Sequence, residues 1–203
     1  YLHQLNSKDP YPAIIHFKNK NNLINHIKNK TYTKPQVILI GAKGRCGKGA
    51  LDLFNSFNCD ITKWDYEETN GKGPFKEILN HDIFINTVFI NKKIPNFINL
   101  ELIAKEKKLT VIGDVSCDPN GPFNPIPIYT KTTSWDFPIQ KIKNINLLAI
   151  DNLPSVLPKE SSDDFSNQLT PQLITLAKKG TEKSHWNSCQ QKFDEFSKTL
   201  NLN

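Results

Sequence analysis

Three regularly spaced glycines, Gly41, Gly44 and Gly47, stand between an aliphatic run and a helical pattern. The run is Val37 to Ile40, which is typical of a strand buried on both faces of a parallel sheet. A turn that holds a pyrophosphate must be tight, must let the backbone approach the ligand, and must start a helix close to the strand; each demand selects glycine. The spacing is G-x-x-G-x-x-G and not the commoner G-x-G-x-x-G. The strand–turn–helix context therefore predicts a loop that binds a dinucleotide phosphate.

Asp65 lies 24 positions after Gly41, at the end of the next strand candidate. A carboxylate about 20 residues beyond such a loop accepts hydrogen bonds from ribose hydroxyls and repels a 2′-phosphate, so Asp65 favours NAD over NADP. An Asp at a strand end is also often only a helix cap or turn former. Arg45, the single arginine, lies inside the loop, which suggests a contact with cofactor or substrate; an incidental surface position is the alternative.

The other motifs in the chain do not indicate a further function. Gly47-Lys48 resembles the end of a P-loop, but that loop needs Gly at position 42 and Ser or Thr at position 49, where this chain has Ala and Gly. The five histidines are dispersed, and the four cysteines lack metal-type spacing such as C-x-x-C. We therefore expect neither an ATPase nor a metal site.

The composition is that of a folded globular chain. Of 203 residues, 37% are hydrophobic and 23% charged, and no apolar run approaches the ~20 residues that cross a bilayer. The formal net charge is +6, but lysines scattered among Asn and Ile supply all except one of the 26 basic residues. Nucleic-acid binders gather Arg and aromatic side chains on one face, so we expect no nucleic-acid and no membrane partner. The cysteine usage favours a reducing, cytoplasmic compartment.

Strand and helix patterns alternate along the chain. Besides 37–40, strands are expected at 60–64, 82–86, 109–115 and 145–150, and helices at 22–30, 96–107, 163–178 and 185–200. This alternation predicts an α/β fold, a Rossmann-like doubly wound, mostly parallel sheet with helices on both faces. We expect a lead-in segment with a helix at 1–34, an NAD-binding Rossmann domain at 35–158 and a C-terminal helical return segment at 159–203.

Seven stretches, taken in order, resemble the NAD-dependent, lysine-forming saccharopine dehydrogenases. They are Ile40-Gly41-Ala42-Lys43-Gly44-Arg45-Cys46-Gly47, Lys63-Trp64-Asp65, Gly73-Pro74-Phe75, Asp82-Ile83-Phe84-Ile85-Asn86, Asp114-Val115-Ser116-Cys117-Asp118, Asn124-Pro125-Ile126-Pro127-Ile128-Tyr129 and Asp151-Asn152-Leu153-Pro154-Ser155. The resemblance covers roughly residues 37 to 160. Thr87 and Asn152 depart from the cysteine and histidine of fungal relatives, which puts side-chain roles there in doubt.

The resemblance implies an enzyme that oxidatively cleaves saccharopine to L-lysine and 2-oxoglutarate while reducing NAD, with this chain as the cofactor-binding part. It implies pyrophosphate contacts at Gly44 and Arg45, beside Gly41, and ribose contacts at Asp65 and Thr69. The nicotinamide side is expected at Phe89, Val115, Ile150, Asp151, Asn152 and Leu153. The family's catalytic lysine and histidine are expected in a further domain before Tyr1, which agrees with the absence of Met. We therefore expect no catalytic residue in this chain.

Two alternatives stay open. The chain could be a non-catalytic NAD-binding module, or part of another two-domain amino-acid dehydrogenase such as an alanine dehydrogenase. The tail from Lys159, with Trp186, Phe193 and Phe196 on one stripe, could pack on the missing domain or cover the local core.

Overall fold

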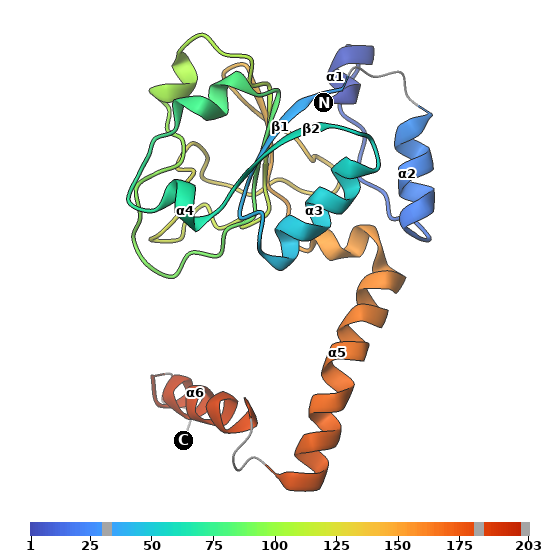
Figure 1. The fold of residues 1–203 in the computed structure, drawn as a ribbon, viewed down its shortest axis with the longest axis vertical. Helices are drawn as coiled ribbons and strands as arrows, with labels where there is room; N and C mark the ends of the chain where they lie inside the picture. Colours follow the sequence, from blue (N-terminus) through green and yellow to red (C-terminus); the bar gives the residue numbers. More distant parts are fainter. Residues whose placement is uncertain (30–33, 181–184, 200–203) are drawn as a thin grey trace. The chain divides into compact units, whose positions relative to one another are not determined.

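The computed structural model describes residues 1–29, 34–180 and 185–199, and the chain divides into two compact units, residues 1–156 and 157–203. The first unit contains the sheet, and the second consists of two helices (Figure 1). The three-part division expected from the sequence, at 1–34, 35–158 and 159–203, stays a prediction.

A six-stranded, mostly parallel sheet forms the centre of the first unit. Its strand order is β2-β1-β3-β4-β6-β5, and only the β5–β6 pair is antiparallel. The strands are β1 (Gln36–Ile40), β2 (Asp60–Trp64), β3 (Ile83–Asn86), β4 (Val111–Asp114), β5 (Gln140–Ile142) and β6 (Ile145–Leu148). The predicted doubly wound α/β fold is confirmed. The expected strands at 109–115 and 145–150 are shorter than predicted, and β5 was not predicted.

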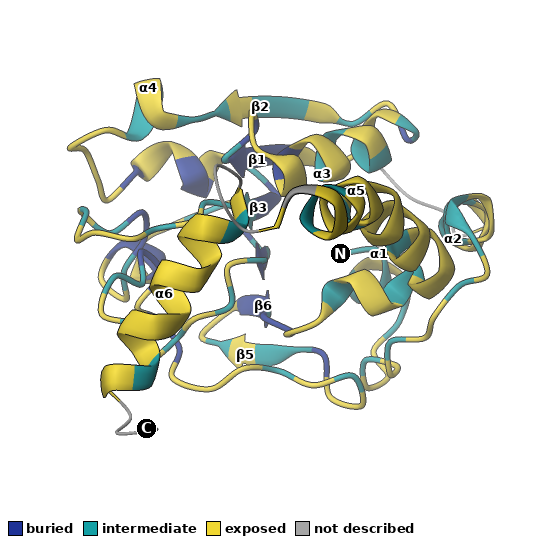
Figure 2. Cartoon of the chain, turned by 90° about the horizontal axis from the view of Figure 1, so that it is seen from below, coloured by how far each residue is buried: buried dark blue, intermediate teal, exposed yellow. Residues whose placement is uncertain are grey.

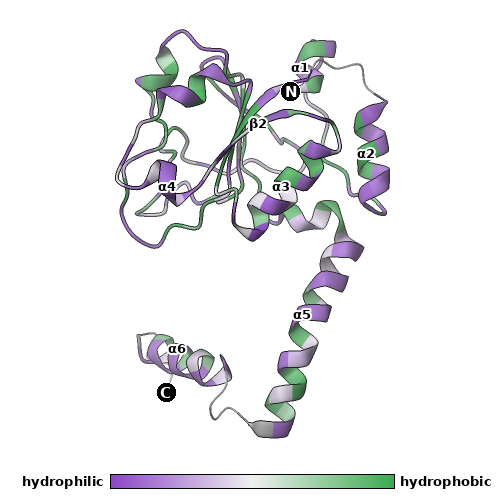
Figure 3. Ribbon diagram, in the orientation of Figure 1, coloured by the Kyte–Doolittle hydropathy of each residue, from purple (hydrophilic) through white to green (hydrophobic). Residues whose placement is uncertain are grey.

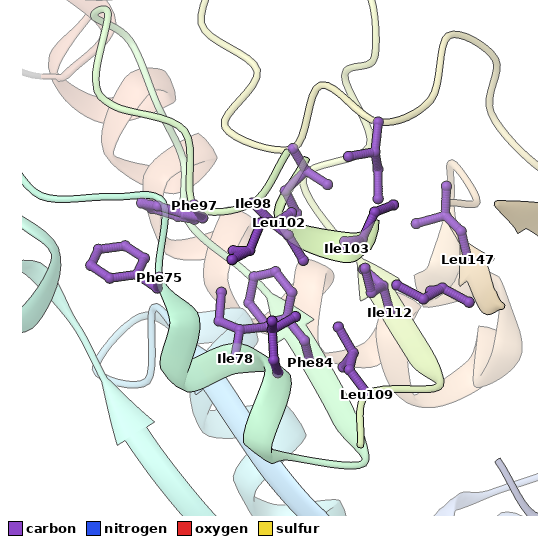
Figure 4. Packing of buried hydrophobic residues seen from close by; sticks show 14 of the residues in the cluster. Phe75, Ile78, Phe84, Phe97, Ile98, Leu102, Ile103, Leu109, Ile112 and Leu147 are labelled. Atoms are coloured by element: carbon purple, nitrogen blue, oxygen red, sulfur yellow. The ribbon is translucent and has the colours of Figure 1, made fainter. Parts of the chain in front are cut away.

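The register aligns large apolar side chains in rows across the sheet. Ile38, Phe84, Ile112 and Leu147 are successive partners on β1, β3, β4 and β6, and all four are fully buried. Side chains from two 3₁₀ helices, η1 (Lys76–Asn80) and η2 (Leu102–Ala104), and from nearby loops pack over this row (Figure 4). Because residues alternate between the two faces of a strand, Val37, Leu39 and their partners face the other way.

The opposite face is covered by α-helices. These are α1 (Leu2–Asn6), α2 (Lys20–Lys28) and α3 (Arg45–Asn55), which lie on one side of the sheet in Figure 1. Leu2, Ile27, Leu53 and Ile83 line a common apolar cavity of about 110 Å³ between these elements. Figure 2 shows the result: the inner strands β1 and β6 are largely buried, whereas the edge strands β2 and β5 are intermediate or exposed. Both faces are therefore protected from water, as a parallel sheet requires.

The expected helix at 96–107 is wrong. Only the short η2 forms there, because neighbouring loops use the backbone of Phe97: its N–H donates to Pro125 O (2.8 Å), and its carbonyl accepts from Phe75 N (2.9 Å). Phe97 and Ile98 are both buried, whereas Leu100 is 48% exposed, so the apolar positions do not follow one helical face. Tertiary hydrogen bonding overrides the local periodicity.

The second unit contains α5 (Pro158–Lys179) and α6 (His185–Thr199). Both expected helices are confirmed, although α5 begins five residues earlier than expected, and the predicted ends at Lys30 and Leu200 lie outside the described residues. The Trp186 indole Nε1–H donates to Gln172 O (3.0 Å), which joins the two helices. Hydrophobic and hydrophilic residues alternate along α5 (Figure 3), and Phe193 and Phe196 are exposed. Within the described parts of the chain, no helix is both long and apolar enough to span a bilayer.

The row of buried residues leads to a quantitative prediction for the stability of the fold. We expect Phe84→Ala to lower the free energy of unfolding by about 3–5 kcal/mol, because it removes a ring from the centre of the packed face. The control is Phe137→Ala, since Phe137 is 79% exposed and should change the value by less than about 0.5 kcal/mol. Urea denaturation of the full chain measures both. Similar losses for the two variants would contradict the assignment of Phe84 to the core.

Candidate functional site

Every predicted site residue follows the carboxyl end of a parallel strand. Gly41 follows β1, Asp65 follows β2, Phe89 follows β3, Val115 follows β4 and Ile150 follows β6. The chain runs from β1 outward to β2 and then returns to add β3 on the other side of β1, so the strand order reverses between β1 and β3. In open α/β sheets, ligands bind at this edge and beside such a reversal.

The glycine loop forms a close turn between β1 and α3. Gly41 has φ +92°, a conformation that glycine adopts without strain, and its amide and that of Ala42 donate to Trp64 O (2.9 and 3.1 Å) at the end of β2. A Cβ on Gly47 would lie 2.1 Å from Gly41 O and 2.9 Å from Ala42 Cα. Only glycine at position 47 lets α3 begin this close to β1.

The N-terminus of α3 is open to an anion. Gly44 is its N-cap and has no side chain to accept a hydrogen bond from the first-turn amides, and that turn contains no acidic residue. Amides and partial positive charge at the start of an 11-residue helix favour a phosphate. Arg45 is the first residue of α3 and is exposed. The predicted pyrophosphate residues therefore lie together at one helix end.

The Asp65 carboxylate joins the glycine loop to the next helical turn. Its Oδ2 accepts from Lys43 N (2.8 Å), and its Oδ1 accepts from Tyr66 N (2.9 Å) as the N-cap of α4 (Tyr66–Thr69). Partial burial opposes ionisation, but these two amide hydrogen bonds and the charge of Lys43 hold the pKa of Asp65 below its usual value. The capping role is thus present, while the ribose contact stays a prediction.

Two neighbouring cavities open at this edge. The first, of about 150 Å³, is lined by Gly41, Asp65, Thr69 and Phe89 among others. The second, of about 300 Å³, is lined by Phe89, Val115, Asp114 and Asp118 among others. Residues 88–90 line both cavities, so this segment is their shared wall. Phe89 is 89% exposed, which leaves its ring free to contact a ligand.

A network of polar groups, most of them buried, holds the shared wall. Asn86 Nδ2 donates to Asp114 Oδ1 (2.9 Å) and to Ser116 Oγ (3.1 Å), and Tyr129 OH donates to Asp114 Oδ2 (2.6 Å). Ser116 Oγ in turn donates to Val88 O (2.6 Å), and Val88 N donates to Asn86 Oδ1 (3.3 Å). Asn86, Asp114 and Tyr129 are at most 4% exposed. Because each polar group has partners, the network fixes the loops after β3 and β4.

This network was not predicted as part of the site. Asn86 and Asp114 are register partners that end two buried strands, so the pattern of a polar residue closing an apolar run could have found them. Tyr129 arrives from a loop 15 residues after Asp114, and no local sequence signal indicates that contact. Thr87 also contributes, since its hydroxyl lies 3.0 Å from Ile40 O and 3.1 Å from Gly41 O and ties β3 to the glycine turn.

The surroundings of the second cavity are electronegative. Burial raises the pKa of Cys117 to about 11, and the charges of Asp114, Asp151 and Asp118 add to the effect. Burial, the hydrogen bond to Asp114 and nearby carboxylates also raise the pKa of Tyr129 far above its usual value. Both side chains therefore stay protonated at neutral pH.

The residues after β6 line neither of these cavities. Ile150 is buried and forms a parallel bridge with Thr133, and Asp151 Oδ1 accepts from Asn152 N (3.0 Å). Asn152 has φ +62°, a left-handed conformation that Asn tolerates better than most residues. The charge of Asp151 reaches Cys117, so the segment lies near the loop after β4.

The glycine turn, the helix start without a side-chain cap and the cavities at the strand reversal define a Rossmann-like dinucleotide-binding domain. The family model "Alanine dehydrogenase/PNT, C-terminal domain" matches residues 67–193, and the chain belongs to this family.

Comparison with individual proteins gives a narrower match than the family model. The chain is 39% identical to "Saccharopine dehydrogenase [NAD(+), L-lysine-forming]" of Neurospora crassa, over 97% of this chain and 57% of that protein. It is 41% identical to the protein of the same name in Candida albicans, over 91% of this chain and 52% of that protein. The chain therefore spans about half the length of these curated relatives. A solved L-alanine dehydrogenase has the same fold, with a TM-score of 0.50 and 17% identity over 71% of this chain and 44% of that one.

Two glycines of α3 provide a matched test of the turn. Gly47→Ala should lower the free energy of unfolding by about 1–3 kcal/mol, because the added Cβ collides with backbone atoms of Gly41 and Ala42. Gly49→Ala meets nothing within 4 Å and should raise stability by up to about 1 kcal/mol, because alanine favours a helix interior. Thermal and urea unfolding measure both. Equal effects of the two substitutions would contradict the close approach at Gly47.

Proposed function

We propose that this chain is the coenzyme-binding part of an NAD-dependent, lysine-forming saccharopine dehydrogenase. In this reaction saccharopine, NAD⁺ and water give L-lysine, 2-oxoglutarate, NADH and a proton. The observation that carries the proposal is the glycine turn, in which the approach of Gly47 to Gly41 O leaves a backbone cradle at the helix start. About 40% identity to enzymes of that name supports the choice of substrate.

Each predicted residue then has a role. Gly44 and Arg45 hold the pyrophosphate at the start of α3, with Gly41 keeping the turn close. Asp65 and Thr69 accept hydrogen bonds from hydroxyls of the adenosine ribose in the first cavity, since the Thr69 hydroxyl donates its own proton to Asp65 O (2.8 Å). Phe89, Val115 and residues Ile150, Asp151, Asn152 and Leu153 bound the nicotinamide side. Bound NAD supplies the hydride acceptor, and this chain orients it.

The proton transfers belong to another part of the enzyme in this proposal. The chain spans about half of its relatives, and we assign the catalytic lysine and histidine to the remaining half. We also propose a cytoplasmic location, which agrees with the four free cysteines. The alternative of an alanine dehydrogenase is less favoured, because the matched alanine dehydrogenases are 30% identical over 72% of this chain, whereas the saccharopine dehydrogenases are 39% and 41% identical over more than nine tenths of it.

The charge of Asp65 gives a direct test. Calorimetric titration of the full chain should show NAD binding at least about tenfold tighter than NADP, because placing a 2′-phosphate beside a fixed carboxylate costs more than ~1.4 kcal/mol. Asp65→Asn removes that charge and should erode most of the preference. Asp60→Asn is the control, since it makes the same substitution at the opposite end of β2, at an exposed residue that does not line the cavity.

Equal affinity for the two coenzymes in the unsubstituted chain would contradict the role of Asp65, and no affinity for either would contradict the proposed function. For the whole enzyme, saccharopine-dependent reduction of NAD by the polypeptide that carries this chain tests the substrate. Alanine-dependent reduction at a higher rate would favour the alternative.

A further inference from the structure

The first cavity carries both signs of charge. Asp65 lies on the wall formed by the end of β2 and α4, and Lys92 lies on the wall formed by the segment after β3. The two residues are 27 positions apart in the sequence, and only the strand reversal brings their segments to one cavity. Lys93, the next residue, is exposed but does not line this cavity.

Lys92 is the cation of this cavity that stays free for a ligand. Lys43, whose amide binds Asp65, has its Nζ 2.9 Å from Glu67 Oε1, so its charge is already paired. Among residues 1–29, 34–180 and 185–199, no carboxylate lies within ion-pairing distance of Lys92. Its flexible four-carbon stem lets the ammonium group follow a bound anion.

The anion of the cavity, by contrast, is fixed. Two backbone amides hold both oxygens of Asp65, and its lowered pKa keeps it ionised at neutral pH. A phosphate on the ribose hydroxyl that Asp65 binds would meet repulsion from one wall and attraction from the other. The preference for one nicotinamide coenzyme over the other then depends on the balance between the repulsion from Asp65 and the attraction to Lys92.

We infer that Lys92 is a second specificity-determining residue of the coenzyme site, one that attracts a ribose 2′-phosphate and so limits the discrimination that Asp65 provides. The inference rests on the proposed function, because it requires the adenosine ribose to occupy the first cavity. Asp65 alone would make NADP a poor ligand, and Lys92 restores part of its affinity.

The test compares two adjacent lysines. Titration of the full chain with NAD and NADP should show that Lys92→Gln lowers NADP affinity about three- to fivefold relative to NAD, as one screened charge pair does. Lys93→Gln should leave the ratio unchanged, and Lys92→Arg should restore it. The same selective loss should appear when Lys92→Gln is added to Asp65→Asn, where NADP binds well enough to measure accurately. The effect should vanish at 1 M salt, where the Debye length is about 3 Å.

Each remaining outcome is decisive. The inference is wrong if Lys92→Gln and Lys93→Gln change the NAD-to-NADP affinity ratio equally. It is also wrong if Lys92→Gln weakens the binding of NAD and NADP equally. In both cases the proposed function stands, provided that NAD still binds and Asp65→Asn erodes the preference for NAD. A chain that binds neither coenzyme would overturn both. Lys92 is exposed, so its variants should fold, and circular dichroism checks this.

Discussion

The contact between Gly47 and the carbonyl of Gly41 constrains the rest of this domain. It lets α3 begin directly beside the end of β1, which places the first amides of the helix at the carboxyl edge of the sheet. The same turn donates two hydrogen bonds to Trp64 O, which fixes the end of β2 against the turn. Asp65 is the next residue, so its position is fixed as well. The start of α3, where we propose that the coenzyme phosphate binds, and Asp65 are therefore both positioned by this turn, and one side-chain carbon at position 47 would disturb both.

A second constraint lies below the surface. Asp114 is 1% exposed, and a buried carboxylate is tolerated only when several donors surround it. Asn86, Ser116 N and Tyr129 are those donors, and they come from β3, the loop after β4 and a distant loop. Losing any of these donors would leave a buried polar group without a hydrogen bond, which is energetically unfavourable. The three segments are therefore held together. The loops that line the cavities are thus fixed from beneath by polar contacts, whereas the centre of the sheet is held by packed apolar rows.

The sequence was informative where local physics decides the structure. The aliphatic run at 37–40 and the glycine spacing predicted β1, the turn and α3, because strand burial and close backbone approach both select residue types locally. The failure at 96–107 has the opposite cause: hydrogen bonds from Phe97 to Pro125 and from Phe75 to Phe97 are long-range, and no local pattern encodes them. Tyr129 was missed as a partner of Asp114 for the same reason. The position of Asp65 at the end of β2 was predicted, but its contact with the Lys43 amide forms only in the folded turn.

The wall formed by residues 88–90 has a thermodynamic consequence. Because it bounds both cavities, a ligand that shifts or restrains this segment in one cavity also changes the free energy of binding in the other. Such linkage is reciprocal, so the two halves of a dinucleotide would bind with a coupling that separate fragments can reveal. A single short segment can in this way make a two-part ligand bind as a unit.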